Sequence, residues 1–477
     1  MPLKAVDENV IKGIANALRE ADDNPNARYT PASFPAAVSR IGALGGQHDI
    51  TFRNAVGNIP RRTFVSEIRN FLLGDTYVEP NSQNPKRENV LEGHVIAARL
   101  TDTKFVMVYK QRTEIRAVIG NLNNTVIQYG VPHVIRRIAP DDAPQDYFAK
   151  VHSMKIVTLS PTRVIVSFVS TATNSGYQYG RLKAFMALNI NGNNIQEETA
   201  LGVVHEYGDY TSLLPVTEEI FLAMTYDGSY GKLFMLRIYN GEILYHQNKV
   251  DIGGCTNIYN NYSMVLLDDA TVAITATFNN QVWVHPYVIN EEGIAKKYAS
   301  AVFDLAGAYN VSAVPIANNK FLLCVGAQGK LYGRTVTVSQ NTTFGEMNSA
   351  LVEGIWFQLN LARINSHSFV LGLFTNSLEQ DGYFTNTIGL EVNGDKIEVT
   401  LEQSHQGTCY GVIEHMSGNN VLMCYNRIYS VAVECTILIA RSGVVIADGT
   451  KPIFGLTTMA ANDGELATIA VPREVHQ

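Results

Sequence analysis

One pattern of hydrophobic and polar positions recurs along most of the chain. In each copy an apolar segment is followed by a short polar turn and then by a second, continuous apolar segment; the first copy is LTDTKFVMVY, which begins at Leu100. The first apolar residues after the turn in seven successive copies are Phe105, Val164, Ile220, Val272, Phe321, Phe369 and Val421. Neighbouring copies are 48 to 59 residues apart. A repeat of this length, built from short strands, is typical of the blades of a β-propeller.

Each copy predicts four strands, which we name A to D in chain order. In the first copy they are HVIAARL, KFVMVYK, EIRAVIGNL and TVIQYGV, all rich in β-branched residues and separated by turn residues. The predicted fold class is mainly β, with a seven-bladed β-propeller over residues 91–477. The segment TTMAANDGELATIAV (457–471) predicts one more hairpin, which could close the ring with N-terminal strands. A propeller of eight blades is therefore the alternative.

Residues 1–45 show a helical spacing instead. Asp7 can cap a first helix, and a second can begin at Ser33 with Pro35 in its first turn. Two helices this short bury too little surface to be stable alone, so we expect them to dock onto another protein. Their apolar faces carry the predicted docking residues Ile11, Ile14, Leu18, Phe34, Val38 and Ile41.

Residues 46–90 are predicted to be a connector. It contains a short strand at 50–52, a third helix over 59–74 and an extended linker with two prolines at 77–90. The linker predicts that the propeller folds without residues 1–88.

The N-terminal stretch VIKGIANALREADDNPNARYTPASFPAAVSRIGAL resembles a helical module of structural proteins in tailed bacteriophages and prophages. The matching residues are Ile14, Ala15, Ala17, Leu18, Arg19, Tyr29, Pro31, Pro35, Ala37, Val38 and Ile41. The linker between the two halves is acidic and rich in Asn, where the module has Lys, Thr and Gly. The resemblance implies a virion protein of a tail, baseplate or appendage, docked on other virion proteins and present in several copies per particle. An ordinary helical hairpin is the alternative.

Loop lengths distinguish the two ends of the predicted blades. The A–B and C–D turns are short, whereas long B–C loops lie at 170–180, 225–231 and 375–386, and long D–A connections at 204–212 and 253–263. Because successive strands of a blade run in opposite directions, all five loops are expected at the same end. Their Tyr, Asn, Gly and Asp content is typical of recognition loops. Ordinary propeller loops of the same composition are the alternative. The predicted binding residues are Tyr177, Tyr179, Tyr207, Asp209, Tyr210, Tyr226, Asp227, Tyr230, Tyr259, Asn260, Tyr262, Asp381 and Tyr383.

Sequence motifs of hydrolases, metalloproteases and nucleotide-binding proteins are absent. We therefore predict no catalysis, no cofactor and no metal site. Asp227 and Asp381 could form a glycosidase-type pair of carboxylates if their loops converge, which keeps a glycan-processing enzyme as one alternative. A cytoplasmic scaffold for protein partners is the other. The acidic pair Asp268 and Asp269 lies in an A–B turn and is explained by turn hydrogen bonds.

Charge and cysteine content narrow the expected partners. The formal net charge is −7, which does not favour nucleic acid, and no run of eighteen apolar residues predicts a membrane span. The five cysteines contain no C-x-x-C pair and are expected to be reduced, buried thiols. The expected partners are other virion proteins at residues 1–45 and a host-surface glycan or protein at the propeller.

Overall fold

The structure is a computed structural model of the 477-residue chain. It describes residues 48–54, 64–78, 95–111, 114–123, 126–137, 151–171, 181–199, 202–205, 211–226, 231–245, 249–252, 262–290, 292–354, 358–374, 384–406, 408–418, 420–427, 432–446, 455–457 and 466–472. These residues form strands and turns, with no helix among them. The chain divides into two compact units, Met1–Asn70 with Arg441–Gln477, and Phe71–Ala440.

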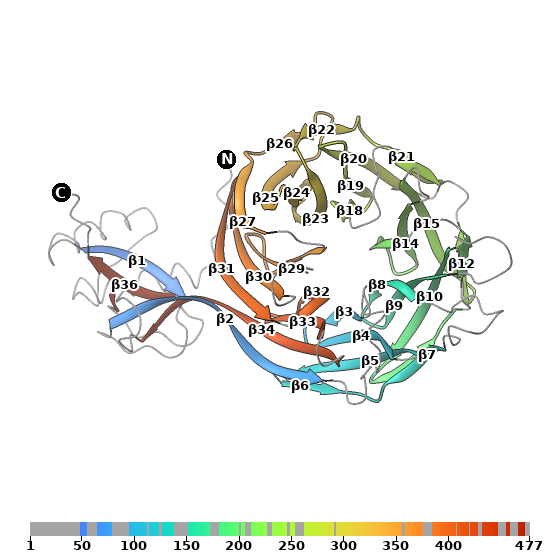
Figure 1. Ribbon diagram of the computed structural model, residues 1–477, viewed down its shortest axis with the longest axis horizontal. Helices are drawn as coiled ribbons and strands as arrows, with labels where there is room; N and C mark the ends of the chain where they lie inside the picture. The colour runs from blue at the N-terminus through green and yellow to red at the C-terminus, as the bar shows by residue number, and fades with distance from the viewer. Residues whose placement is uncertain are drawn as a thin grey trace, which may run out of the picture. The chain divides into compact units, whose positions relative to one another are not determined.

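The unit Phe71–Ala440 contains a series of antiparallel sheets whose strands follow the predicted repeats (Figure 1). The first sheet is β3 (Val95–Thr101), β4 (Lys104–Gln111), β5 (Glu114–Asn123), β6 (Val126–Tyr129) and β7 (His133–Arg137). The second is β8 (Val151–Ser160), β9 (Arg163–Thr171), β10 (Arg181–Asn191), β11 (Asn194–Glu197) and β12 (Gly202–His205). The third is β13 (Thr211–Pro215), β14 (Ile220–Tyr226), β15 (Gly231–Tyr239), β16 (Glu242–Tyr245) and β17 (Val250–Ile252).

The next three sheets repeat this plan. The fourth is β18 (Tyr262–Leu266), β19 (Thr271–Phe278), β20 (Gln281–Asn290), β21 (Gly293–Lys296) and β22 (Ala301–Asp304). The fifth is β23 (Ala308–Ala317), β24 (Lys320–Ala327), β25 (Lys330–Thr337), β26 (Thr343–Phe344) and β27 (Asn348–Glu353). The sixth is β28 (Gln358–Arg363), β29 (Ser368–Phe374), β30 (Phe384–Asn393) and β31 (Lys396–Gln406).

The predicted D strand is divided in the first five sheets. Two short strands there occupy the outer position and both pair with strand C, as β6 and β7 do with β5. In the first sheet the break falls at 130–132, where Pro132 has no N–H to donate to a ladder. The sixth sheet keeps a single outer strand, β31.

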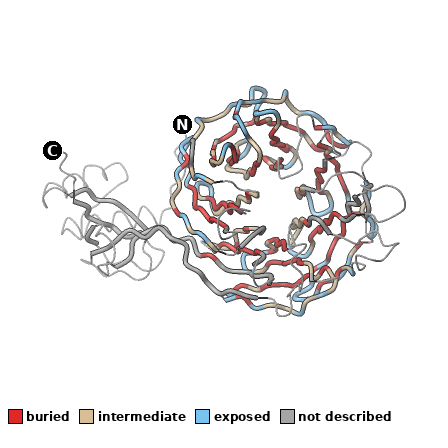
Figure 2. Tube along the Cα trace, viewed as in Figure 1, coloured by how far each residue is buried: buried red, intermediate tan, exposed pale blue. Residues whose placement is uncertain are grey.

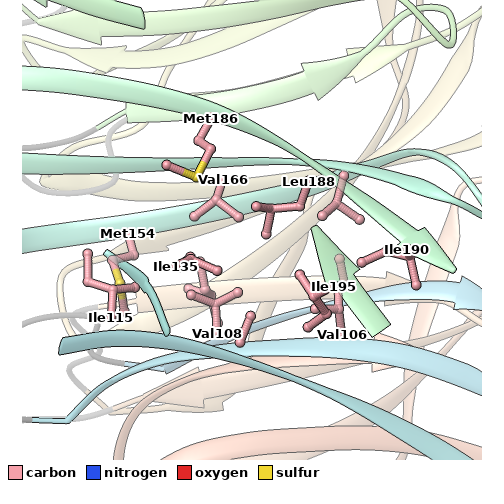
Figure 3. Close-up of a cluster of buried hydrophobic side chains, with 14 of the residues drawn as sticks. Val106, Val108, Ile115, Ile135, Met154, Val166, Met186, Leu188, Ile190 and Ile195 are labelled. Atoms are coloured by element: carbon pink, nitrogen blue, oxygen red, sulfur yellow. The ribbon is translucent and has the colours of Figure 1, made fainter. Parts of the chain in front are cut away.

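The sheets form a ring around their inner A strands. The strands β3, β8, β13, β18, β23, β28 and β32 contact one another in that order, and β32 contacts β3. Many residues of the ring are buried (Figure 2), and their apolar side chains form clusters that join neighbouring sheets. Between the first two sheets, for example, Val106 and Val108 face Val166 and Leu188 (Figure 3). Antiparallel sheets packed face to face around a ring are the architecture of a β-propeller.

The described residues contain six self-contained blades, not the seven that the repeat count predicts. The strands of the seventh repeat, β32 (Thr408–His415), β33 (Asn420–Arg427) and β34 (Ala432–Ile446), belong to a seven-stranded sheet ordered β1-β36-β35-β2-β34-β33-β32. The reason is that β34 runs straight through residues 440–443, where the sequence predicts the C–D turn, so the described part of this repeat has no separate D strand. Its place beside β34 is taken by β2 (Phe64–Val78). An eighth blade is likewise not formed by the described residues.

The connector also differs from its prediction. The segment predicted as a third helix over 59–74 contributes to strand β2, so that prediction was wrong. Phe64 pairs with Leu456 and Val65 with Gly455, and these ladder partners are distant in sequence, which a local helical spacing cannot reveal. The strand predicted at 50–52 is confirmed as β1 (His48–Asn54).

The predicted C-terminal hairpin is present and pairs with N-terminal strands. Strand β35 (Gly455–Thr457) pairs with β36 (Leu466–Pro472), and β36 also pairs with β1. These strands fall in the unit Met1–Asn70 with Arg441–Gln477, while the strand beside β34 is β2. The predicted helical module at 1–45 lies outside the described residues, as do its docking residues Ile11, Ile14, Leu18, Phe34, Val38 and Ile41.

The cysteines only partly follow the expectation of buried, reduced thiols. Cys324 is free and buried, and burial raises its pKa to about 12. Cys424, however, is disulfide-bonded, and the residue directly opposite it on the next strand is Cys435. In the part of the chain that the structure describes, no helix could cross a membrane.

Side chains at the A–B and C–D end, which we call the plain end, tie neighbouring blades together. The hydrogen bonds of Asp268 confirm the predicted turn chemistry, because its carboxylate accepts hydrogen bonds from the backbone N–H groups of Ala270 (2.9 Å) and Thr271 (2.5 Å).

Other side chains at the plain end join neighbouring blades. Between the fifth and sixth blades, Lys320 Nζ donates to Gly394 O (3.2 Å) and to Asp395 Oδ1 (3.1 Å). Thr335 donates to the same carboxylate. These hydrogen bonds from Thr335 and Lys320 lower the pKa of Asp395.

We expect Asp395→Asn to reduce the free energy of unfolding by about 1 kcal/mol at pH 7, because it removes a charge-assisted contact at a partly exposed site. The folded-state pKa of Asp395 is lowered, so its contribution is present above the unfolded pKa and is lost as pH falls through the folded pKa. Urea unfolding should therefore show a difference between wild type and variant that shrinks at acidic pH. The control is Glu353→Gln, whose side chain is 76% exposed in its ion pair with Lys330. A difference that grows with acidity would contradict the assignment.

Candidate binding site at the loop-bearing end

The strand registers place the B–C and D–A loops of a blade at one end, which we call the loop-bearing end. In the second blade, Thr171 pairs with Arg181 across the 172–180 segment, and the neighbouring Leu182 pairs with His205, the last residue of β12. In the third blade, Gly231 pairs with both Tyr226 and Ile252. The segments 172–180, 206–210, 227–230 and 253–261 are thus bounded by strand ends on that side of their blades.

Long B–C loops are confined to some of the blades. The fourth and fifth blades instead have two-residue hairpin turns at Asn279–Asn280 and Gln328–Gly329. All four residues have positive φ, between 48° and 70°, as type I′ turns require. The B–C connections are therefore short in these two blades, whereas the second, third and sixth blades have longer ones.

Tyr262 is a core residue and not an exposed recognition residue, which corrects its assignment. It is the first residue of β18, is 9% exposed, and packs between the third and fourth blades. Its hydroxyl donates a hydrogen bond to Met224 O (3.4 Å). Strand β18 begins at Tyr262 and so includes the last two residues of the predicted connection at 253–263, and the tyrosine ring therefore packs between the two blades.

The described structure does not test whether the other predicted binding residues lie close together, because all but Tyr226 lie outside the described residues. Tyr226 is the last residue of β14. The following lie outside the described residues: Tyr177, Tyr179, Tyr207, Asp209, Tyr210, Asp227, Tyr230, Tyr259, Asn260, Asp381 and Tyr383. The carboxylate pair of Asp227 and Asp381 is among them.

Polar residues that sequence reasoning missed lie between the second and third blades. Toward the plain end this seam is apolar, with Ile165 and Phe185 packed against Phe221 and Phe234. Val157 pairs with Ile165 in this apolar part. One step closer to the loop-bearing end on the same face, the cross-strand pair is Lys155 on β8 and Ser167 on β9. The seam therefore changes from apolar to polar as it approaches the loops.

Lys155 and Ser167 both lack satisfying partners. Ser167 is 1% exposed and its Oγ has no hydrogen-bond partner. Lys155 is half-buried, and burial lowers the pKa of its amine. No hydrogen bond or ion pair joins it to another described residue. The signal that could have found it is its position: a lysine stands inside an inner strand, where charged side chains are rarely placed.

Another crowded ionisable side chain on an inner strand, Glu414, has an opposite charge nearby. Burial raises the pKa of Glu414 on β32 to about 7, and the nearby Arg99 acts in the opposite direction. Arg99 belongs to β3 and donates to His415 O (3.3 Å) and to the Asp102 carboxylate. Among the described residues, no three His, Cys, Asp or Glu side chains are grouped so as to hold a metal ion.

Comparison with known proteins finds distant structural similarity and no related sequence. No family model and no curated protein matches the sequence. The WD40 domain of Toxoplasma gondii coronin aligns over 85% of this chain and 94% of its own length, with 9% identity and a TM-score of 0.45. A Lactobacillus plantarum protein aligns over 71% and 100%, with 10% identity and a TM-score of 0.44. The NanB sialidase of Streptococcus pneumoniae aligns over 76% and 70%, with 9% identity and a TM-score of 0.40. The chain is thus a β-propeller protein by its own sheet topology.

Proposed function

We propose that this chain is a non-catalytic binding protein of a bacteriophage particle. It docks through residues 1–45 and presents the loop-bearing end of its propeller to a glycan or protein on the host surface. The virion role is supported by the resemblance of residues 10–44 to the phage helical module. The binding role is supported chiefly by one observation, the strand registers that direct the long Tyr- and Asn-containing segments of the second and third blades to one end.

A rigid propeller with such loops suits recognition for physical reasons. Tyrosine supplies a large amphipathic contact area and has few torsions to order, so binding loses little conformational entropy. Several copies on one particle would multiply weak individual contacts, so an affinity on the order of micromolar per copy is sufficient for attachment.

We expect replacement of Tyr207, Tyr210, Tyr226 and Tyr230 with Ser to weaken binding at least tenfold while leaving the melting temperature nearly unchanged. The measurement is binding of the purified protein to an array of bacterial surface polysaccharides and to intact bacterial cells. The matched control carries four Ala substitutions in plain-end turns, at Thr103, Thr162, Glu218 and Asp269. Equal losses from both sets would refute a functional difference between the ends.

The same purified protein tests the catalytic alternative. Release of sugars from an array polysaccharide, abolished by Asp227→Asn or Asp381→Asn, would establish a glycan-processing enzyme instead. Immunogold electron microscopy of particles from the strain that encodes the chain tests the virion assignment, and we expect label on a tail, baseplate or appendage. Absence of the chain from purified particles would overturn it.

A further inference from the structure

We propose that the seam between the second and third blades holds a subsite for a singly charged oxyanion, bound by the Lys155 ammonium and the Ser167 hydroxyl. The ligand class is a carboxylate, as on an acidic sugar, or a phosphodiester, as in a phosphate-linked polymer. The inference deepens the proposed function and rests on it, since it assigns a charge to the ligand of the loop-bearing end.

The register brings the two side chains together. Lys155 and Ser167 are directly opposite each other on antiparallel β8 and β9, so they project from the same face of the sheet. Directly opposed residues in such a ladder have Cβ atoms about 5 Å apart. Their same-face neighbours, Val157 and Ile165, pack with Phe221 of the third blade, which shows that this face looks into the seam.

Both groups need a partner that the described chain does not supply. A buried hydroxyl without a hydrogen bond and a desolvated cation without a countercharge are each unfavourable. An oxyanion placed between them would accept a hydrogen bond from each and neutralise the ammonium. Glu414, another crowded ionisable group on an inner strand, differs in that the positive charge of Arg99 opposes the effect of its burial.

In three other blades the same position holds a hydrogen-bond acceptor. Ser263 Oγ accepts from Ala313 N (3.1 Å), Ser312 Oγ from Leu361 N (3.2 Å), and Asn360 Oδ1 from Ile413 N (2.7 Å). Each bond ties an inner strand to the next one. Lys155 is the register equivalent of these three acceptors, because each lies opposite the fourth residue of its B strand, counted from the first buried apolar residue.

An ammonium cannot accept a hydrogen bond, so Lys155 cannot form this inter-strand bond. The equivalent backbone N–H in the third blade belongs to Leu213. This seam therefore has hydrogen-bond donors at the place where three other seams have an acceptor. Three donors and one positive charge at a single place select an oxyanion.

The subsite lies between the apolar part of the seam and the loop-bearing end. Lys155 is half-buried, so part of its side chain is accessible to solvent. Strand β9 continues from Ser167 to Thr171, and the 172–180 segment follows it. On the third blade, Lys232 lies on the face opposite to Leu233, which packs toward the fourth blade, so Lys232 looks toward the second. Its Nζ is 3.9 Å from Asp251 Oδ1, and its side chain is 16% exposed.

Binding of small probes to the full chain tests the proposal. Glucuronate and dimethyl phosphate represent the two oxyanion classes, and glucose is the neutral control, with affinities measured by isothermal titration calorimetry. We expect wild type to bind at least one anion, Lys155→Met to weaken that binding at least tenfold, and Ser167→Ala to weaken it about threefold. Lys155→Arg should retain part of the affinity. Lys296→Met, which removes an exposed lysine on β21, is the matched control for loss of one charge.

The anion that binds more tightly identifies the source of the oxyanion. Thermal melting without ligand verifies folding, and Lys155→Met should melt at the wild-type temperature or above it, because it removes a desolvated charge. Failure of wild type to bind either anion, or equal binding by wild type and Lys155→Met, overturns the subsite. If array binding still depends on the loop tyrosines in that case, the proposed function stands without it. If anion binding depends on Lys155 but the loop variants lose nothing, the subsite stands and the proposed function fails.

Discussion

A chain that begins at residue 89 should fail to form a stable propeller, whereas a chain that begins at residue 46 should melt like the full-length protein. The linker at 77–90 suggests that the propeller folds without everything before it, but the sheet order leads to the opposite expectation. Strand β2 lies beside β34, and among the described residues no D strand follows β34 to take its place. Without β2, a 15-residue strand would have an unpaired edge. We expect a loss of about 4 kcal/mol or more, with aggregation on heating.

Both truncated chains lack the predicted docking residues, so comparing them separates folding from docking. Circular dichroism melting and size-exclusion chromatography of the two proteins give the folding result. Identical melting temperatures would show that β2 is dispensable and that the linker prediction describes the boundary correctly. Neither chain should enter particles if residues 1–45 are the docking module.

The second large effect is expected in the first blade, where Gly120→Val should cost about 3 kcal/mol. Gly120 lies opposite Phe105, and a Cβ atom at position 120 would be 2.2 Å from the ring carbon Cζ of Phe105. Phe105 is fully buried, so its ring has no free space to move into. Overpacking of this kind typically destabilises a core by roughly 1–3 kcal/mol, and occasionally by more.

A double-mutant cycle makes this prediction specific to the pair. Phe105→Ala alone should cost about 3–5 kcal/mol because it leaves a cavity. In the Phe105→Ala background the valine at position 120 has room, so the double variant should be more stable than the sum of the two changes predicts by about 1–3 kcal/mol. Urea unfolding of the four proteins measures this coupling. Strict additivity would mean that the ring and the glycine do not constrain each other.

The candidate site shows why part of it was visible in the sequence and part was not. Loop length and composition identified the loop-bearing end, because the alternation of strands in an antiparallel blade decides on which side each connection lies. Lys155 escaped this reasoning. One lysine within an apolar run indicates little until the register places it opposite Ser167 and shows that Ser263, Ser312 and Asn360 hold the same position. Tyr262 was misplaced for a related reason: a tyrosine at a strand end can face either solvent or a seam, and only packing decides.

The sequence alone determined the mainly β class, the repeat spacing, the A to C strands of six blades and the acidic turn at Asp268. All of these follow from local physics: period-two burial, β-branched composition and side chains that bond their own turn. The tertiary structure decided where the seventh repeat ends and which strand completes it. It also made a strand of the segment from Phe64 onward, whose helical spacing was misleading. The physical reason is that strand pairing is non-local, so the partners of an edge strand are chosen by segments hundreds of residues away, as β2 is by β34 and β35.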